Sequence, residues 1–332
     1  VLLAAATAAF ATETPAPAWN PDAWKANFNA DGTPKPLKDP RDTKVWPNRK
    51  SFANSDPWIA ANHDRLRQMR PRILLINLAN YAPEGKPMDL ARQLIANLRE
   101  STRYKGFRDP KAPAFLEYSG WRYVALRDPA PQAGHTSNSP IKPDVKEGMN
   151  TDYGGFFSQK FAEYIGVRDP KDRSRFLRLD ELVDKGYVHE VVVVAAAAGD
   201  IRMLECVEEK PQYDRNFKQV PGKWVQAGNG GDDDQPWTGR SLRINSLNVD
   251  RGIGCGMENL GHSFEGTAHS GAIPYFTKYF HEYGMFDLDK RYGLPFNSFY
   301  RLWGEGKGIE YPDKNTAIPF ERVDAFCHTD RP

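Results

Sequence analysis

Residues 187–195 constrain the fold of this chain more than any other segment. They read YVHEVVVVA, and the apolar residues follow one another without the alternation of a half-exposed strand. Such a strand is buried on both faces, as it is in the centre of a parallel sheet. The segment therefore predicts a sheet that is covered by other structure on both sides.

Strand and helix patterns alternate on either side of this segment. Three further strands are expected at residues 72–78, 115–126 and 240–248. Three helices are expected at residues 88–103, 156–165 and 179–185. Residues 208–239 look irregular and polar. The succession predicts an α/β layered domain with a mostly parallel central sheet and long irregular loops. Ligands of such sheets bind at the carboxyl ends of strands, so the loops after Leu78, Ala195 and Asn248 are expected to hold the site.

The N-terminal part differs from the rest in composition. Residues 1–11 are a short apolar run that ends in Ala-Phe-Ala, which predicts the remnant of a secretory signal peptide. Residues 12–54 are expected to be an extended Pro-rich lead-in, and residues 55–332 a single α/β domain. No later segment has the roughly 18 apolar residues that a membrane helix needs. We therefore expect a secreted or periplasmic protein without stable membrane insertion.

The balance of charges and the number of cysteines bear on the kinds of partner and the cellular compartment that the protein can have. The chain has 45 Lys and Arg against 43 Asp and Glu, a net charge of +2, so nothing indicates a nucleic-acid partner. In an oxidising compartment, Cys206, Cys255 and Cys327 would give one disulfide and one remaining thiol, and their spacing does not say which two pair. The absence of a C-x-x-C motif argues against a structural zinc knuckle.

Residues 252–271, GIGCGMENLGHSFEGTAHSG, carry the densest chemistry in the chain. Glycines at alternate positions follow an expected strand and predict a loop that opens a helix. The N–H groups at such a helix start could hold an anion. Arg251, Gly254 and Gly256 are therefore candidate substrate-binding residues. Trp237 is a fourth, because its ring could stack on a sugar, although it could also simply anchor its loop.

The helix expected from residue 257 to about residue 269 carries a stripe of ionisable side chains. Glu258, His262, Glu265 and His269 follow one another at i, i+4, i+7 and i+11, within about 60° of arc. Carboxylates and imidazoles on one stripe suit a divalent metal or a general acid/base pair. Glu258, His262 and Glu265 are therefore candidate catalytic and metal-binding residues. A solvated face with Glu–His pairs, or a buried structural network, is the alternative.

Two loops offer further candidates. Residues 228–237, GNGGDDDQPW, hold three adjacent carboxylates, and calcium prefers such oxygen ligands. Asp233 and Asp234 could complete a metal site with the helix stripe, whereas a solvated acidic turn is the alternative. His135, in the long loop at residues 127–154, is a candidate catalytic base or ligand. The cofactor expected is a divalent metal, either zinc or calcium.

Three motifs in order carry a resemblance to a known group of proteins. The strand YVHEVVVV, the pattern R-I-N-x-x-x-x-x-R-G-I-G and the segment ENLGHSFEGT together resemble large secreted bacterial proteins of unknown function. The resemblance spans about residues 180–300. Some of those proteins carry carbohydrate-binding or dockerin-like appendages, so it implies export and a polysaccharide setting but supplies no mechanism.

These observations lead to two alternative functions. The first is a secreted hydrolase-type enzyme, metal-dependent or carboxylate-based, that acts on an extracellular polymer such as a glycan or peptide, or on a small molecule. The second is a non-catalytic protein of the cell envelope, or a calcium-stabilised glycan binder. The sequence leaves the substrate, the disulfide pairing and the oligomeric state open.

Overall fold

The computed structural model describes twelve stretches of the chain, and the structural statements that follow concern these alone. They are residues 22–37, 43–45, 67–79, 82, 85–103, 114–126, 143–144, 150–195, 203, 205–216, 218–228 and 235–284. The chain divides into two compact units: Val1–Leu204 with Asp234–Glu258, and Glu205–Asp233 with Asn259–Pro332. None of the described helices is long and apolar enough to cross a membrane.

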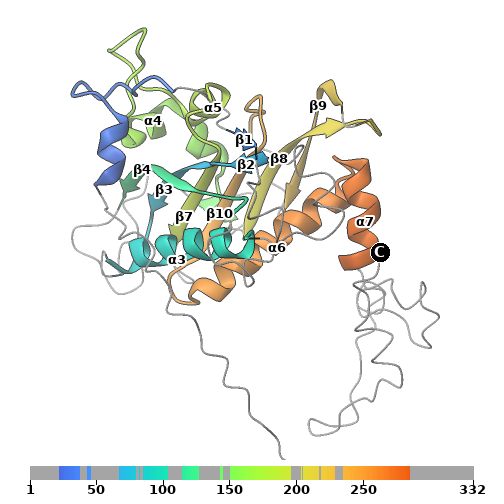
Figure 1. The fold of residues 1–332 in the computed structure, drawn as a ribbon. Helices are drawn as coiled ribbons and strands as arrows, with labels where there is room; N and C mark the ends of the chain where they lie inside the picture. Colours follow the sequence, from blue (N-terminus) through green and yellow to red (C-terminus); the bar gives the residue numbers. More distant parts are fainter. Residues whose placement is uncertain are drawn as a thin grey trace, which may run out of the picture. The chain divides into compact units, whose positions relative to one another are not determined.

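Four parallel strands form the centre of the first unit (Figure 1). In their order across the sheet they are β4 (Ser119–Ala125), β3 (Arg72–Asn77), β7 (Glu190–Ala195) and β10 (Leu242–Asn248). Every residue of β3 and β7 is buried, as an unbroken apolar run predicts for central strands. The expected parallel sheet is therefore confirmed for these four strands.

Helices and short elements complete the first unit. Helix α3 (Gly85–Ser101) packs Ala91 and Leu94 around Leu75 and Val192, so its apolar stripe covers one face of the sheet. The other helices are η1 (Ala23–Asn27), η3 (Gly154–Phe157), α4 (Gln159–Ile165) and α5 (Leu179–Asp184). Two small antiparallel pairs join β1 (Thr43–Val45) to β2 (Arg67–Met69), and β5 (Pro143–Asp144) to β6 (Asn150–Thr151).

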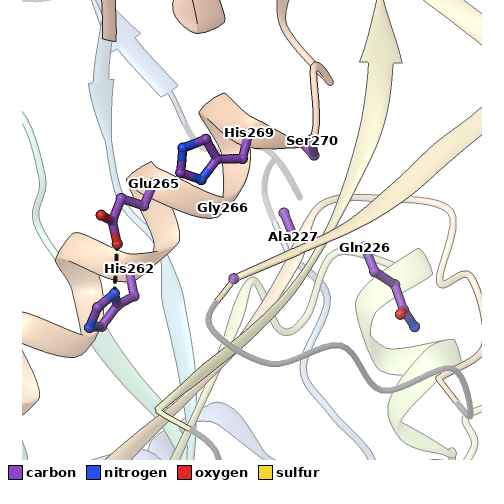
Figure 2. Close-up of a pocket in the computed structure, with 8 residues that line it drawn as sticks. Gln226, Ala227, His262, Glu265, Gly266, His269 and Ser270 are labelled. Carbon is purple, nitrogen blue, oxygen red and sulfur yellow. Dashed lines mark hydrogen bonds and ion pairs between the residues drawn. The ribbon is translucent and has the colours of Figure 1, made fainter. Parts of the chain in front are cut away.

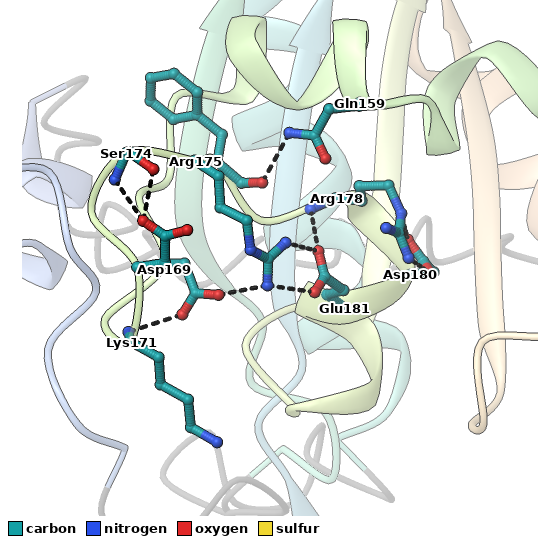
Figure 3. A network of polar contacts seen from close by, with 10 residues as sticks. Gln159, Asp169, Lys171, Ser174, Arg175, Arg178, Asp180 and Glu181 are labelled. Atoms are coloured by element: carbon teal, nitrogen blue, oxygen red, sulfur yellow. Dashed lines mark hydrogen bonds and ion pairs between the residues drawn. The ribbon is translucent and has the colours of Figure 1, made fainter.

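An ion-pair network fixes the chain between α4 and α5 (Figure 3). Arg175 donates two hydrogen bonds to the Glu181 carboxylate, at 2.8 and 2.9 Å, and also pairs with Asp169. The backbone N–H of Arg178 donates to Glu181 as well, at 2.9 Å, where α5 begins. The hydrogen bonds from Arg175 hold the pKa of Glu181 at about 2, well below its ordinary value of 4.5.

An antiparallel hairpin opens the second unit. Its strands are β8 (Cys206–Tyr213) and β9 (Gln219–Gly228), so the expectation of an irregular segment at residues 208–239 is wrong there. Among these strands, only the four of the first unit show the expected parallel pairing, because β8 and β9 pair antiparallel. The charges of β8 suggested a loop, yet Glu208 and Glu209 are 3% and 0% exposed. The carboxylate of Glu208 is accommodated by Ser263 of α6 and by Lys210, and the contact with α6 is one that a local pattern does not reveal.

Helix α6 (Ile253–His269) runs from the first unit into the second and is followed by α7 (Pro274–Gly284). It begins four residues earlier than the sequence pattern predicts. The Asn248 side chain accepts a hydrogen bond from the backbone N–H of Asp250 at 2.9 Å, which forms a turn directly after β10. Gly252, with φ of +77°, then leads the chain into the helix.

This early start overturns the predicted glycine loop. Gly254 and Gly256 lie in the first turn of α6, so they are helical residues rather than part of a loop. Gly254 is exposed and has open space around it, whereas a Cβ on Gly256 would lie 2.3 Å from Cδ2 of Leu247. The small size of Gly256 therefore lets the helix approach β10 closely.

Candidate functional site

The C-terminal turns of α6 border a pocket of about 400 Å³ in the second unit (Figure 2). Its lining consists of Gln226, Ala227, Gly228, His262, Glu265, Gly266, His269 and Ser270. The helix contributes His262, Glu265 and His269 from one face, as the sequence spacing predicts. The end of β9 forms the opposite wall, and the lining is rich in groups that donate or accept hydrogen bonds.

Two carboxylates lie beside the imidazole of His262. Its Nδ1 lies 2.7 Å from Oε2 of Glu265, a hydrogen bond in which the ring nitrogen donates because a carboxylate only accepts. Its Nε2 lies 3.4 Å from Oε2 of Glu205, at the start of the hairpin. The side chains of His262, Glu265 and Glu205 are 26%, 22% and 33% exposed, so all three can meet a ligand from solvent.

Glu258 lies one turn before His262 on the same helix. It belongs to the first unit, whereas Glu205 and His262 belong to the second, where a carboxylate oxygen of Glu205 lies within 4.8 Å of a ring nitrogen of His262. The grouping of Glu258 with His262 stays a prediction. Glu265, in contrast, uses its carboxylate to orient the ring, which is a different role from that of a metal ligand.

The other predicted site residues that the structure describes do not line this pocket. Trp237 is half-buried, and Arg251 is exposed in the turn between β10 and α6. Neither they nor Gly254 and Gly256 are among the residues that line the pocket. His135, Asp233 and Asp234 lie outside the described residues, as do the predicted signal-peptide remnant at residues 1–11 and most of the lead-in at residues 12–54.

Glu205 is the site residue that the sequence analysis missed. It stands alone at the start of a strand and shares no periodicity with the helix stripe, so only the tertiary structure brings it to His262. An acidic residue directly before a strand is the only signal that sequence offered, and it is a common one.

Within the described residues, no disulfide joins Cys206 to Cys255, and the expected disulfide stays a prediction. Cys206 is buried at the start of β8, Cys255 is half-buried in the first turn of α6, and both are thiols. Cys327 lies outside the described residues.

The spacing of the His262 and Glu205 ligand atoms fits a zinc ion. Zinc binds imidazole nitrogen and carboxylate oxygen at about 2.0–2.1 Å in tetrahedral geometry, which separates two ligand atoms by about 3.4 Å. Nε2 of His262 and Oε2 of Glu205 are 3.4 Å apart. The hydrogen bond from Nδ1 to Glu265 matches the carboxylate support that metal-bound histidines commonly have.

Comparison of the chain with protein-family models, with curated proteins and with solved structures finds no match. The resemblance to large secreted bacterial proteins stays a prediction.

Proposed function

We propose that this chain is an exported, zinc-dependent hydrolase whose metal ligands are Nε2 of His262 and the Glu205 carboxylate. One observation carries it: a ring nitrogen of His262 is fixed by Glu265 while the other faces Glu205 at 3.4 Å. Side chains that only cover a solvated helix face need no such two-sided arrangement.

The residues of the pocket suit hydrolysis of a polar substrate. A bound zinc ion would supply a water molecule whose pKa is lowered toward neutrality. Glu265 keeps the proton of His262 on Nδ1 and so keeps the ring in the ligand tautomer. Gln226, His269 and Ser270 line the same pocket and offer donors and acceptors to hydroxyl or amide groups. A glycan or a peptide, the substrates expected from sequence, carries such groups.

Elemental analysis of the purified chain tests the metal site. The wild-type protein is expected to hold close to one equivalent of zinc, and His262→Ala and Glu205→Gln are expected to lose it. His269→Ala is the matched control, because this histidine lines the pocket from the same helix but is not among the proposed ligands. The control should retain the metal. Zinc that persists in both ligand variants would refute the assignment.

A hydrolysis screen with chromogenic glycosides and peptide amides tests the activity. Turnover should disappear with a zinc chelator and return when zinc is added. Saturable glycan binding without turnover, in protein that holds calcium rather than zinc, would instead support the non-catalytic alternative.

A further inference from the structure

A buried carboxylate joins the two segments that carry the proposed ligands. Glu208, in β8, accepts a hydrogen bond from the Ser263 hydroxyl of α6 with one oxygen and pairs with the Lys210 ammonium through the other. Glu208 and Ser263 are each 3% exposed, and the Lys210 side chain is 23% exposed. We call these three residues the Glu208 cluster. All three belong to the second unit.

The Glu208 cluster lies next to both ligands in the chain. Ser263 directly follows His262, and Glu208 comes three residues after Glu205, which is about 10 Å of extended chain. Glu208 and Lys210 are two residues apart in β8, so they face the same side of the strand, toward Ser263. The hydrogen bond therefore fixes how α6 is rotated and placed against the strand that follows Glu205.

Helix α6 makes a second close contact with the hairpin farther along, at Gly266. That contact sets only how closely the helix and β9 approach each other. A Cβ on Gly266 would lie 2.0 Å from the backbone nitrogen of Gly228, so helix and hairpin touch there without side chains between them. Such a backbone contact is not directional and allows the helix to slide or rotate. A charge-assisted hydrogen bond is directional, and Glu208–Ser263 is such a bond between the helix and β8.

We propose that Glu208 is a positioning residue of the metal site, which sets the separation of His262 and Glu205 through Ser263. The inference rests on the proposed function, since it names what holds that function's ligands in place. Residues that hydrogen-bond directly to metal ligands typically alter metal affinity by about 10–100-fold when they are replaced. We expect an effect of that size even though neither Glu208 nor Ser263 touches the metal.

The test measures cobalt and zinc affinity of the full chain by competition with a chromophoric chelator. Ser263→Ala is the main variant, because alanine is a good helix former and only the hydroxyl is lost. Glu208→Gln is the second variant. Thr267→Val is the matched control, since it removes a buried hydroxyl one turn farther along α6. Thermal unfolding of the metal-free proteins separates loss of fold from loss of positioning.

The expected result is a 10–100-fold weaker metal affinity in Ser263→Ala and Glu208→Gln, with an altered cobalt absorption spectrum and with Thr267→Val unchanged. Wild-type affinity and spectrum in Ser263→Ala would overturn the proposal. So would an equal loss in Thr267→Val, because it would indicate general loosening of the helix.

A measurement without metal separates this inference from the proposed function. The imidazole ¹⁵N resonances of His262 should shift on Glu205→Gln in the wild-type background, and the shift should be much smaller in the Ser263→Ala background. If the wild-type chain binds no zinc, the proposed function fails, while the NMR comparison still decides whether Glu208 positions His262. An equal shift in both backgrounds would refute the positioning role.

Discussion

Replacing either of two glycines in α6, five residues apart, by alanine should change the stability of the protein in opposite directions. Gly261 is exposed, and a Cβ there would meet no other heavy atom within 4 Å. A Cβ on Gly266 would lie 2.0 Å from the nitrogen, 2.6 Å from the Cα and 2.9 Å from the oxygen of Gly228. Gly261→Ala and Gly266→Ala therefore differ only in what the new methyl group meets.

The magnitudes follow from helix propensity and overpacking. Alanine in a helix interior is favoured over glycine by about 0.8–1 kcal/mol, so Gly261→Ala should stabilise the protein by close to that amount. At Gly266 the backbone of Gly228 must retreat by about 1.4 Å to restore ordinary contact, and overpacking of a tight interface costs about 1–3 kcal/mol or more. The clashing atoms are backbone, so no rotamer change can relieve the contact. We expect Gly266→Ala to destabilise the protein by about 2 kcal/mol.

Urea unfolding followed by far-UV circular dichroism measures both effects. Gly256→Ala gives an intermediate case, because its Cβ would meet the end of the Leu247 side chain, which can move aside. Opposite signs for Gly261 and Gly266, about 3 kcal/mol apart, are the expected outcome. If the two variants agree within about 0.5 kcal/mol, the close approach of α6 to β9 is refuted.

Two further predictions concern ion pairs of the first unit. Because Arg175 holds the pKa of Glu181 at about 2, the pair stabilises the fold above about pH 4.5 and the contribution is lost as pH falls toward 2. Glu181→Gln should therefore lower the free energy of unfolding by about 1–2 kcal/mol at neutral pH, a value reduced for solvent screening. Near pH 2 the same substitution should change it by almost nothing. A loss of stability that does not depend on pH in urea titrations would contradict this. Arg243 donates to the buried carboxylate of Glu190 at 2.6 Å, so Arg243→Met should destabilise by about 3–5 kcal/mol, and adding Glu190→Gln should recover part of that loss. A double variant no more stable than Arg243→Met alone would show that the stranded charge is not the cause.

Sequence alone determined the elements whose signal is local. The apolar run of β7 predicted a buried central strand, and periodicity predicted β3, α3 and α5 close to their observed bounds. The same reasoning placed His262 and Glu265 on one face of α6, because helical spacing follows from the chain itself. These predictions needed no knowledge of which segments meet in space.

Only the tertiary structure decided which segments meet, and there the sequence analysis failed. The charges of β8 suggested a loop, yet Glu208 is buried because Ser263 and Lys210 satisfy its two oxygens. Glu205 reaches His262 only through the placement of β8, and Gly256 is a packing residue rather than part of a loop. A local pattern records the period of a segment but not the partner that compensates a buried charge or fills the space beside a glycine. For Glu208, the partner on α6 lies 55 residues farther along the chain.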